Sequence, residues 1–406
     1  MFRANQNHNQ QSMFESTEWM DPRIKNKLEK SWAPIFYEQV FRKIDEAPFA
    51  VLYGKTGNPN FPVNIILSLE YIKHMKDCTD QELLESFYFD YLVNYAVGIR
   101  TLGGINLAER TLYYFRERVY KYSLENPGND DILFGQFVNL LGRFVKEAGI
   151  FMDEQRTDTT LFMSNIKKAG RISLAYDVLV KAIKEMPDNI RTGKFLKVLE
   201  PGFKTDVLYR SKAEEGDGKL TIILTLCKEA VAALETQPGV AGSEGLRIAK
   251  RFVSEQSVED SSGKITARPN KEITSSSLQS AYDEDATYRK KGNIGQSGYS
   301  LEISETCGKG NLFQLITDYS VRQNNVSDVE MLNERLRTIR ENTGCKNMYA
   351  DGGFHSEKVN QTAEENGIEI HLTNMTGTKP VLGLPMGVII ILWLTRVEVF
   401  ENQAAT

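Results

Sequence analysis

The fold of this chain is decided by the stretch Asn347-Met348-Tyr349-Ala350-Asp351-Gly352-Gly353-Phe354. Strand-forming residues lead to one carboxylate, Asp351, and the two glycines after it allow the backbone to turn sharply. A helical pattern follows, from a Ser356 N-cap to a stop at Gly367, and residues 368–372 then alternate like a strand. This order predicts Asp351 at the end of a buried strand, where α/β folds collect their functional groups. Taken alone, the turn after Asp351 is more simply interpreted as an Asx turn between two elements.

A second acid, Asp158, lies upstream in a similar setting and changes that balance. Residues 152–162 gather β-branched residues around this carboxylate, and basic residues follow it. A strand with a central acid and a basic exit is one half of a candidate metal site, because carboxylates from different strands can share a cation. Taken alone, the same run is typical of an edge strand with exposed polar residues.

Composition limits the classes of protein to consider. The chain has 406 residues, 41% hydrophobic and 25% charged, which is typical of a folded protein with two or three domains. Its net charge of −5 does not favour a polyanion partner, so a nucleic-acid surface would have to be a local basic patch. The four cysteines are widely spaced and indicate neither a zinc site nor a disulfide framework. Free thiols and the absence of an apolar signal segment favour a cytoplasmic protein without a membrane partner.

The N-terminal third is expected to be helical. Residues 1–23 are polar, and we expect a disordered tail there. Residues 24–130 show helical periodicity with short connections, which predicts an all-α bundle. Its helix near residues 108–122 interleaves aromatic residues with four cations that could rest on DNA phosphates, namely Arg110, Arg116, Arg118 and Lys121. On these residues alone, a solvated charged face over an aromatic core stripe is favoured.

Residues 131–380 are expected to form a mixed sheet core. Its expected elements, in chain order, are a helix over 133–145, the strand with Asp158, a helical insertion over 172–270, two strands at 298–303 and 312–317 with a turn at 308–310, and a helix through 331–339. The strand that ends at Asp351 follows. The expected fold class is therefore α+β or α/β, with an N-terminal all-α bundle followed by a mixed sheet core that contains a helical insertion.

Without the insertion, this order of elements matches the ribonuclease H-like layout. The chain resembles the insertion-sequence transposases of the DDE class, which belong to the retroviral-integrase superfamily. Three stretches carry the resemblance: residues 156–160 look like the family's first-Asp strand, 281–293 like its run before the core hairpin, and 349–354 like its second-Asp strand. Residues 62–118 also resemble the helical N-terminal domain of the family. The run 281–293 is the most specific of these motifs.

The resemblance implies a DNA transposase that cuts and joins DNA ends by two-metal phosphoryl transfer. Asp158 would bridge two Mg²⁺ (or Mn²⁺) ions and Asp351 would hold one of them. The implied partners are transposon terminal inverted repeats and further copies of the chain, and the implied location is the nucleoid when DNA is bound. Three bases, Arg289, Lys290 and Lys291, could contact phosphates near the metals, or could equally pair with the preceding acids Asp283, Glu284 and Asp285.

The family pattern stops at about Pro380, before the helix that should carry a third acid. Residues 381–406 form an aberrant tail that begins with an uncharged apolar run over 381–394, which is shorter than the about 20 residues of a membrane helix. We therefore expect a truncated chain. The weaker candidates for the third acid are Glu364, Glu365, Glu398 and Glu401.

Three interpretations follow from these observations. The chain is an active transposase, or it is a catalytically inactive fragment that binds DNA through its N-terminal bundle, or it is an α/β protein unrelated to nucleic acid. The position of Asp158 relative to Asp351 separates the third interpretation from the first, because a shared metal requires that the two carboxylates meet.

Overall fold

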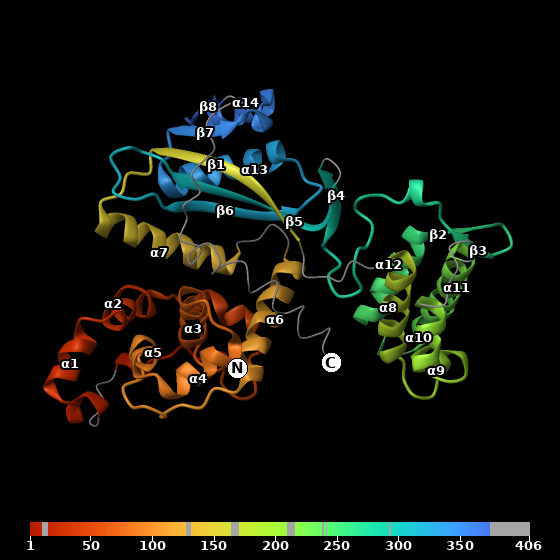
Figure 1. Ribbon diagram of the computed structural model, residues 1–406, viewed down its shortest axis with the longest axis horizontal. Helices are drawn as coiled ribbons and strands as arrows, with labels where there is room; N and C mark the ends of the chain where they lie inside the picture. Colours follow the sequence, from red (N-terminus) through yellow and green to blue (C-terminus); the bar gives the residue numbers. More distant parts are fainter. Residues whose placement is uncertain are drawn as a thin grey trace.

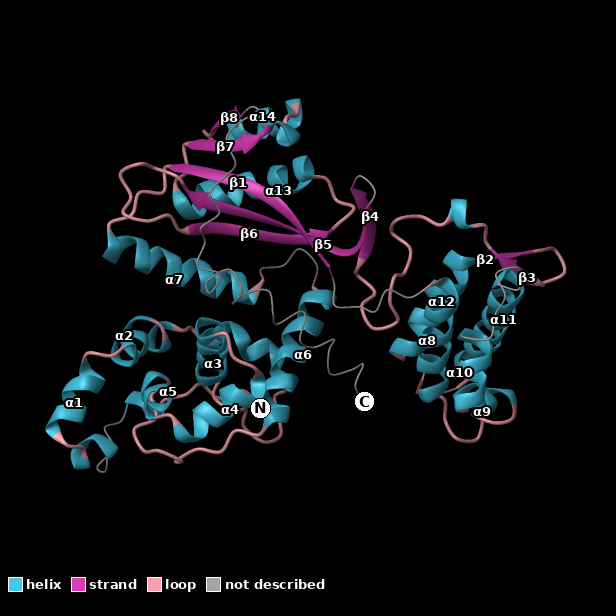
Figure 2. Ribbon diagram, in the orientation of Figure 1, coloured by secondary structure: helices cyan, strands magenta, loops and turns pink. Residues whose placement is uncertain are grey.

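The computed structural model describes most of the chain as a mixed α/β structure (Figures 1 and 2). A helical N-terminal bundle lies on one side of a sheet, and a second group of helices lies beyond one end of that sheet. The expected tail 381–406, with Glu398 and Glu401, falls outside the described residues. These are residues 1–9, 15–126, 131–163, 170–208, 216–237, 239–240, 242–291 and 294–373.

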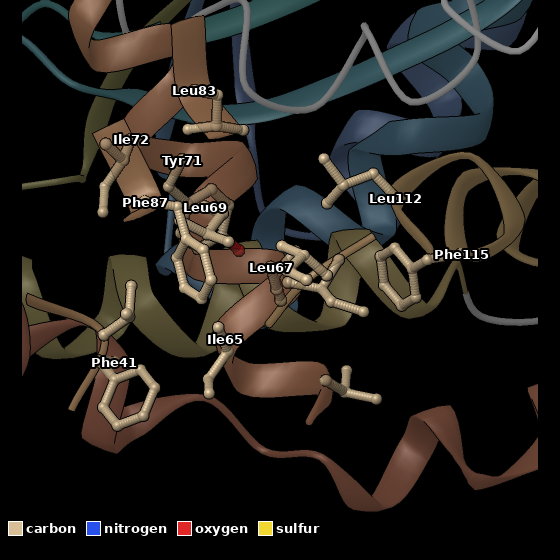
Figure 3. Packing of buried hydrophobic residues seen from close by; sticks show 14 of the residues in the cluster. Phe41, Ile65, Leu67, Leu69, Tyr71, Ile72, Leu83, Phe87, Leu112 and Phe115 are labelled. Carbon is tan, nitrogen blue, oxygen red and sulfur yellow. The ribbon is translucent and has the colours of Figure 1, made fainter. Parts of the chain in front are cut away.

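The N-terminal bundle is built around helix α3 (Val63–Lys76). Every residue from Val63 to His74 is buried, so α3 is a core helix surrounded by its neighbours (Figure 3). A capping box begins α4, where Thr79 and Glu82 each accept a hydrogen bond from the other's backbone N–H. The remaining helices are α1 (Pro22–Glu29), α2 (Trp32–Gln39), α4 (Asp80–Phe89), α5 (Tyr91–Ala96) and α6 (Glu109–Glu125).

The N-terminal segment differs from our expectation of disorder. In its described parts, residues 1–9 and 15–23, the Met1 amino group donates to the Asn58 carbonyl, and the buried Asn5 donates its backbone N–H to the Glu46 carboxylate. Glu46 also accepts from the backbone N–H of Val63, at the start of α3. One buried carboxylate thus ties this segment to the bundle, and local composition does not reveal a contact made so far along the chain.

Helix α7 (Ile132–Ala148) joins the bundle to the sheet. Its first turn belongs to the hydrophobic core of the bundle, and Gln136 donates to the Asp45 carbonyl at 2.9 Å. The rings of Phe134 and Phe137 contact the ring of Tyr319, on a strand of the sheet. The boundary expected at residue 130 is therefore followed at once by a helix that packs against both parts.

The expected helical insertion has a hydrophobic core of its own. A short two-stranded hairpin, which the sequence did not predict, ends it. The elements of the insertion are α8 (Arg171–Lys184), α9 (Lys194–Leu199), α10 (Pro201–Leu208), α11 (Gly216–Glu235), α12 (Glu244–Gln256), β2 (Ser257–Glu259) and β3 (Ile265–Ala267).

The main sheet is mixed and has the lateral order β6-β5-β1-β7-β8. Strand β5 is antiparallel to both of its neighbours, β1 and β6, whereas β7 runs parallel to β1 and β8 runs parallel to β7. Strand β4 pairs with the first residues of β5. Within the described residues, the strands are β1 (Glu154–Met163), β4 (Thr287–Lys291), β5 (Ile294–Thr306), β6 (Ile316–Gln323), β7 (Asn347–Asp351) and β8 (Glu369–Thr373).

The central hairpin is longer than predicted. The predicted strand over 312–317 begins only at Ile316, and Leu312 lies in the connecting loop, where it is 91% exposed. Strand β4 was missed because its charged residues do not alternate with apolar ones. Such a sequence is tolerated in a strand at the edge of a sheet, where charged side chains stay in water.

Two helices cover one face of the sheet where β7 lies. Helix α13 (Asp328–Thr343) begins after its Ser327 cap and ends at Gly344 in the left-handed conformation, and α14 (Glu357–Glu365) begins after the expected Ser356 cap. Their apolar side chains bury Met348 and Ala350 of β7. In the described part of the chain, none of the helices has both the length and the apolar character needed to span a membrane.

On the same face of the sheet, the side chains of β5 are polar although they are buried. Ser300, Glu302 and Ser304 alternate along β5, and Glu302 accepts from the Thr157 hydroxyl of β1 at 3.2 Å. On β6, Asp318 forms an ion pair of 2.6 Å with Arg335 of α13. Burial, together with the Asp318 and Asp328 carboxylates, raises the pKa of Glu302 to about 8, although the Thr157 hydroxyl and Arg335 act to lower it.

We expect the Glu302→Gln variant to lose a pH dependence of stability. Folded, this carboxyl keeps its proton up to about pH 8, whereas in the unfolded chain it ionises near 4.5. The contribution of Glu302 to the free energy of unfolding is complete below the pKa of the unfolded chain and is lost as pH rises through the pKa of the folded protein. The loss is at most roughly 1.4 kcal/mol per pH unit. Urea unfolding at several pH values in this window should show a loss in the parent that the variant lacks. Equal losses in both proteins would contradict the assignment.

Candidate functional site

The two acids singled out in the sequence lie on neighbouring parallel strands. In the β1–β7 ladder, Gln155 pairs with Met348 and Arg156 pairs with Tyr349. Continuing the ladder by two residues brings Asp158 level with Asp351, the last residue of β7. Neighbouring strands lie about 4.8 Å apart, so this register places the two carboxylates next to each other.

Both carboxylates belong to the face of the sheet opposite α13. Successive residues of a strand point to opposite faces, and both acids are exposed while the residues before them are buried. The buried set consists of Gln155 and Thr157 on β1 and Met348 and Ala350 on β7. The structure therefore brings Asp158 and Asp351 together on one accessible face.

The turn after β7 holds Asp351 in position. Asp351 Oδ1 accepts from the backbone N–H of Gly353 at 2.7 Å, so the Asx turn that the sequence allowed is present. A Cβ atom at residue 353 would lie 2.9 Å from the same oxygen, which explains why glycine is needed there. Among the described residues, no other hydrogen bond to the Asp351 side chain is recorded, so the turn and a role for its second oxygen are compatible.

Asp158 has a different setting. Its Oδ1 accepts from the backbone N–H of Thr159 at 2.8 Å. On the same face, Arg156 forms an ion pair of 2.5 Å with Glu305 of β5. The charge of Glu305 is therefore compensated by Arg156. Sequence reasoning missed the pair because its members are 149 residues apart and only strand pairing joins them.

An aromatic pair lies beside the acids. Tyr349 of β7 and His371 of β8 are opposite each other in the ladder, and their rings stack with centroids 4.8 Å apart. His371 Nε2 also lies 3.0 Å from Asn347 Oδ1. The pair extends the accessible face sideways from Asp351, and the alternation over 368–372 was the signal that could have located His371 on it.

The donor set fits a hard cation but is small. Carboxylate oxygens are the ligands that Mg²⁺ prefers, and water can complete its coordination. Within the described residues, the structure contains no cluster of three or more His, Cys, Asp or Glu side chains suited to a metal. Glu364 and Glu365, two candidates for a third acid, are exposed on α14, as expected. The acids thus form a pair.

The candidate DNA contacts on α6 separate into two groups. Arg110, Arg118 and Lys121 are exposed. Arg118 lies over the Tyr53 ring at 4.9 Å, and Lys121 forms an ion pair with Glu117 at 2.6 Å, one turn earlier. Exposed cations of this kind keep a mobile head group in water and can exchange such partners for phosphates.

Arg116 is wrongly predicted as a DNA contact, because it is fully buried. Its guanidinium donates to Glu70 at 3.0 Å and to Asp80 at 2.7 Å. Asp80 also pairs with Lys73. Burial alone would lower the pKa of Arg116, but the two carboxylates raise it above its ordinary value. In the sequence, a cation of the core cannot be distinguished from the exposed cations on either side of it.

The basic run at β4 also divides. Arg289 Nη1 lies 3.7 Å from Asp328 Oδ1, whereas Lys290 is exposed. The side chain of Lys291 falls outside the described residues. The preceding acids have other partners: Glu284 pairs with Arg247, and Asp283 accepts from the Tyr299 hydroxyl. Asp283 and Glu284 therefore have partners other than the bases of β4, with which one of the two alternatives had paired them.

Comparisons with known proteins add no further identification: no protein-family model matches the chain, and neither a curated protein nor a solved structure does.

We expect Arg116→Ala to destabilise the N-terminal bundle by about 3–5 kcal/mol, because it leaves two carboxylates without their buried partner. Arg118→Ala is the matched control on the same helix and should change stability by about 1 kcal/mol or less. Urea unfolding followed by circular dichroism measures both. Similar stabilities for the two variants would show that the buried network is not stabilising.

Proposed function

We propose that this chain is an insertion-sequence DNA transposase, which cuts and joins DNA ends by phosphoryl transfer. The observation that carries the proposal is the β1–β7 register, which pairs Arg156 with Tyr349 and, extended by two residues, places Asp158 level with Asp351 on one exposed face. Had the two residues lain on opposite faces or on distant strands, a shared metal would have been excluded.

The topology supports a ribonuclease H-like core. The antiparallel strands β1, β5 and β6 come first in the chain; β7 is then added beside β1 and β8 beside β7, both parallel and each preceded by a helix. The functional acids of such a core lie on its central strand and on the parallel strand beside it. This is where Asp158 and Asp351 lie.

The two acids would hold Mg²⁺ (or Mn²⁺), with water as the remaining ligand. When bound, such ions activate a water or a 3′-hydroxyl as nucleophile and stabilise the leaving oxygen of a phosphodiester. The contribution of the chain is to fix the carboxylates. The backbone ladder sets their separation, and the turn at Gly353 holds one oxygen of Asp351.

A second candidate function is DNA binding without cleavage. It is favoured by the size of the donor set, because the described residues provide a pair of acids and no larger cluster. In this case the exposed cations of α6 would carry the function, with Arg118 and Lys121 on the DNA phosphates. Terminal inverted repeats and assembly with further copies of the chain belong to both candidates.

We expect Asp158→Asn and Asp351→Asn each to abolish Mg²⁺-dependent strand cleavage. The substrate is duplex DNA from the genomic flanks of the gene, with end-labelled strands separated on denaturing gels. Loss of a metal-ligating carboxylate should lower the rate by about 100-fold or more. Glu357→Gln, an exposed acid on α14, is the control and should cleave like the parent. Cleavage by the parent with equal rates in all variants would remove the acid pair from the site.

We expect the double variant Arg118→Ala/Lys121→Ala to bind duplex DNA with a weaker salt dependence. Each phosphate contact contributes about −0.9 to the slope of log K against log salt, so the slope should fall by roughly 2. Fluorescence anisotropy on the full chain measures it. Binding without cleavage by the parent would favour the second candidate, whereas an unchanged slope in the double variant would place the DNA contacts elsewhere.

A further inference from the structure

The segment that returns from the insertion to β4 is attached to the insertion by several contacts. We call residues 274–286 the strap. Leu278 and Ala281 of the strap are buried in the core of the insertion. Glu284 forms an ion pair with Arg247 of α12, and Arg251 donates to the Glu284 carbonyl at 2.7 Å. The strap is therefore held against the insertion as far as Glu284, although Gln279 of the strap also accepts from the Ser297 hydroxyl of β5 at 3.2 Å.

One residue earlier, the strap is attached to the sheet. Asp283 is fully buried, and its Oδ1 accepts from the Tyr299 hydroxyl of β5 at 2.5 Å and from the Ala286 N–H at 3.2 Å. The Tyr299 ring stacks on the ring of Phe162 of β1, with centroids 5.6 Å apart. Asp283 and Glu284 are thus adjacent residues that bind different parts of the protein.

The contact lies on the acid-bearing face of the sheet. Phe162 and Tyr299 are paired in the β1–β5 ladder, and Phe162 has the same alternation as Asp158, four residues earlier on β1. At about 3.3 Å per residue, these two positions on β1 are separated by roughly 13 Å. The attachment of the insertion therefore shares a face and a strand with the candidate site.

A residue of the N-terminal bundle acts electrostatically on this contact. Tyr120 of α6 is close enough to raise the pKa of Tyr299, after burial and Asp283, and to raise the pKa of Arg247 as a smaller influence beside its Glu284 ion pair. Tyr120 lies between Arg118 and Lys121 in the chain, the exposed cations of the same helix. The electrostatic influence of α6 therefore extends to Tyr299 and Arg247, on either side of the contact between the strap and the sheet.

We infer that the Tyr299–Asp283 hydrogen bond is the positioning contact that fixes the helical insertion relative to the acid-bearing face. The ion pair of Glu284 with Arg247 holds the strap to the insertion. Because Asp283 is the adjacent residue, its hydrogen bond to Tyr299 restricts how far the insertion can move relative to β5. Because the hydroxyl and the carboxylate are both buried, water cannot take over either side of the hydrogen bond, and breaking it costs free energy. If the proposed function holds, the contact also sets where DNA held by the insertion or by α6 meets Asp158.

The test is hydrogen–deuterium exchange of the full chain, parent against Tyr299→Phe, which removes one hydroxyl and keeps the ring. We expect amides of residues 278–288 to exchange about tenfold faster or more, as for the loss of a hydrogen bond to a charged group. Exchange in α11 and α3, within the cores of the insertion and the bundle, should stay at the parent's rate. Small-angle scattering should show a larger maximum dimension for the variant, because the insertion becomes free to reorient.

Two further variants make the result decisive. Tyr288→Phe removes the hydroxyl of another tyrosine next to the strap, and it should match the parent. Asp283→Asn keeps an oxygen that can accept from Tyr299, and it should exchange at a rate between those of the parent and Tyr299→Phe. Unchanged exchange in the strap, or an equal increase in α11 and α3, would overturn the inference. Neither measurement involves DNA or metal, so the result stands whatever the outcome of the cleavage experiments.

Discussion

The parallel pairing of β1 with β7 is the constraint on which the rest of the structure depends. It joins the antiparallel half of the sheet to the parallel half, and its register decides which side chains reach the exposed face. Because strand side chains alternate with a period of two, a slip of one residue in β1 would bury Asp158 and expose Thr157. The apolar packing of Met348 and Ala350 under α13 and α14 resists such a slip in β7, and thereby protects the placement of Asp351.

Buried charge contributes to the packing of the N-terminal bundle and of α13 on the sheet. In the N-terminal bundle, Arg116 is enclosed by Glu70 and Asp80, and Glu46 holds the first residues of the chain. Under α13, Arg335 pairs with Asp318 beside Glu302, whose pKa is raised by burial. These networks are costly to bury and costly to break, because removing one member leaves the others without a partner.

Local patterns in the sequence were sufficient for the elements near the acids, and insufficient for the contacts between distant elements. The cap at Ser356 and the strand ending at Asp351 follow from side chains within a few residues, so they were predicted. The burial of Arg116, the pairing of Arg156 with Glu305 and the strand nature of β4 depend on partners far along the chain. A charged residue has the same local signature whether its partner is water or a buried carboxylate, which explains why the buried Arg116 was included among the candidate DNA contacts.

The topology of the sheet also determines when it can be completed during synthesis. The central strand β1 leaves the ribosome before the whole insertion, while its two neighbours, β5 and β7, come from far later in the chain. The N-terminal bundle and the insertion have separate cores, so each can fold while β1 still lacks both partners. An unpaired strand with two open edges is a template for wrong pairing with other chains. Translation speed through the insertion therefore sets how long the nascent protein is exposed to aggregation, and a chaperone that shields this strand would improve its yield.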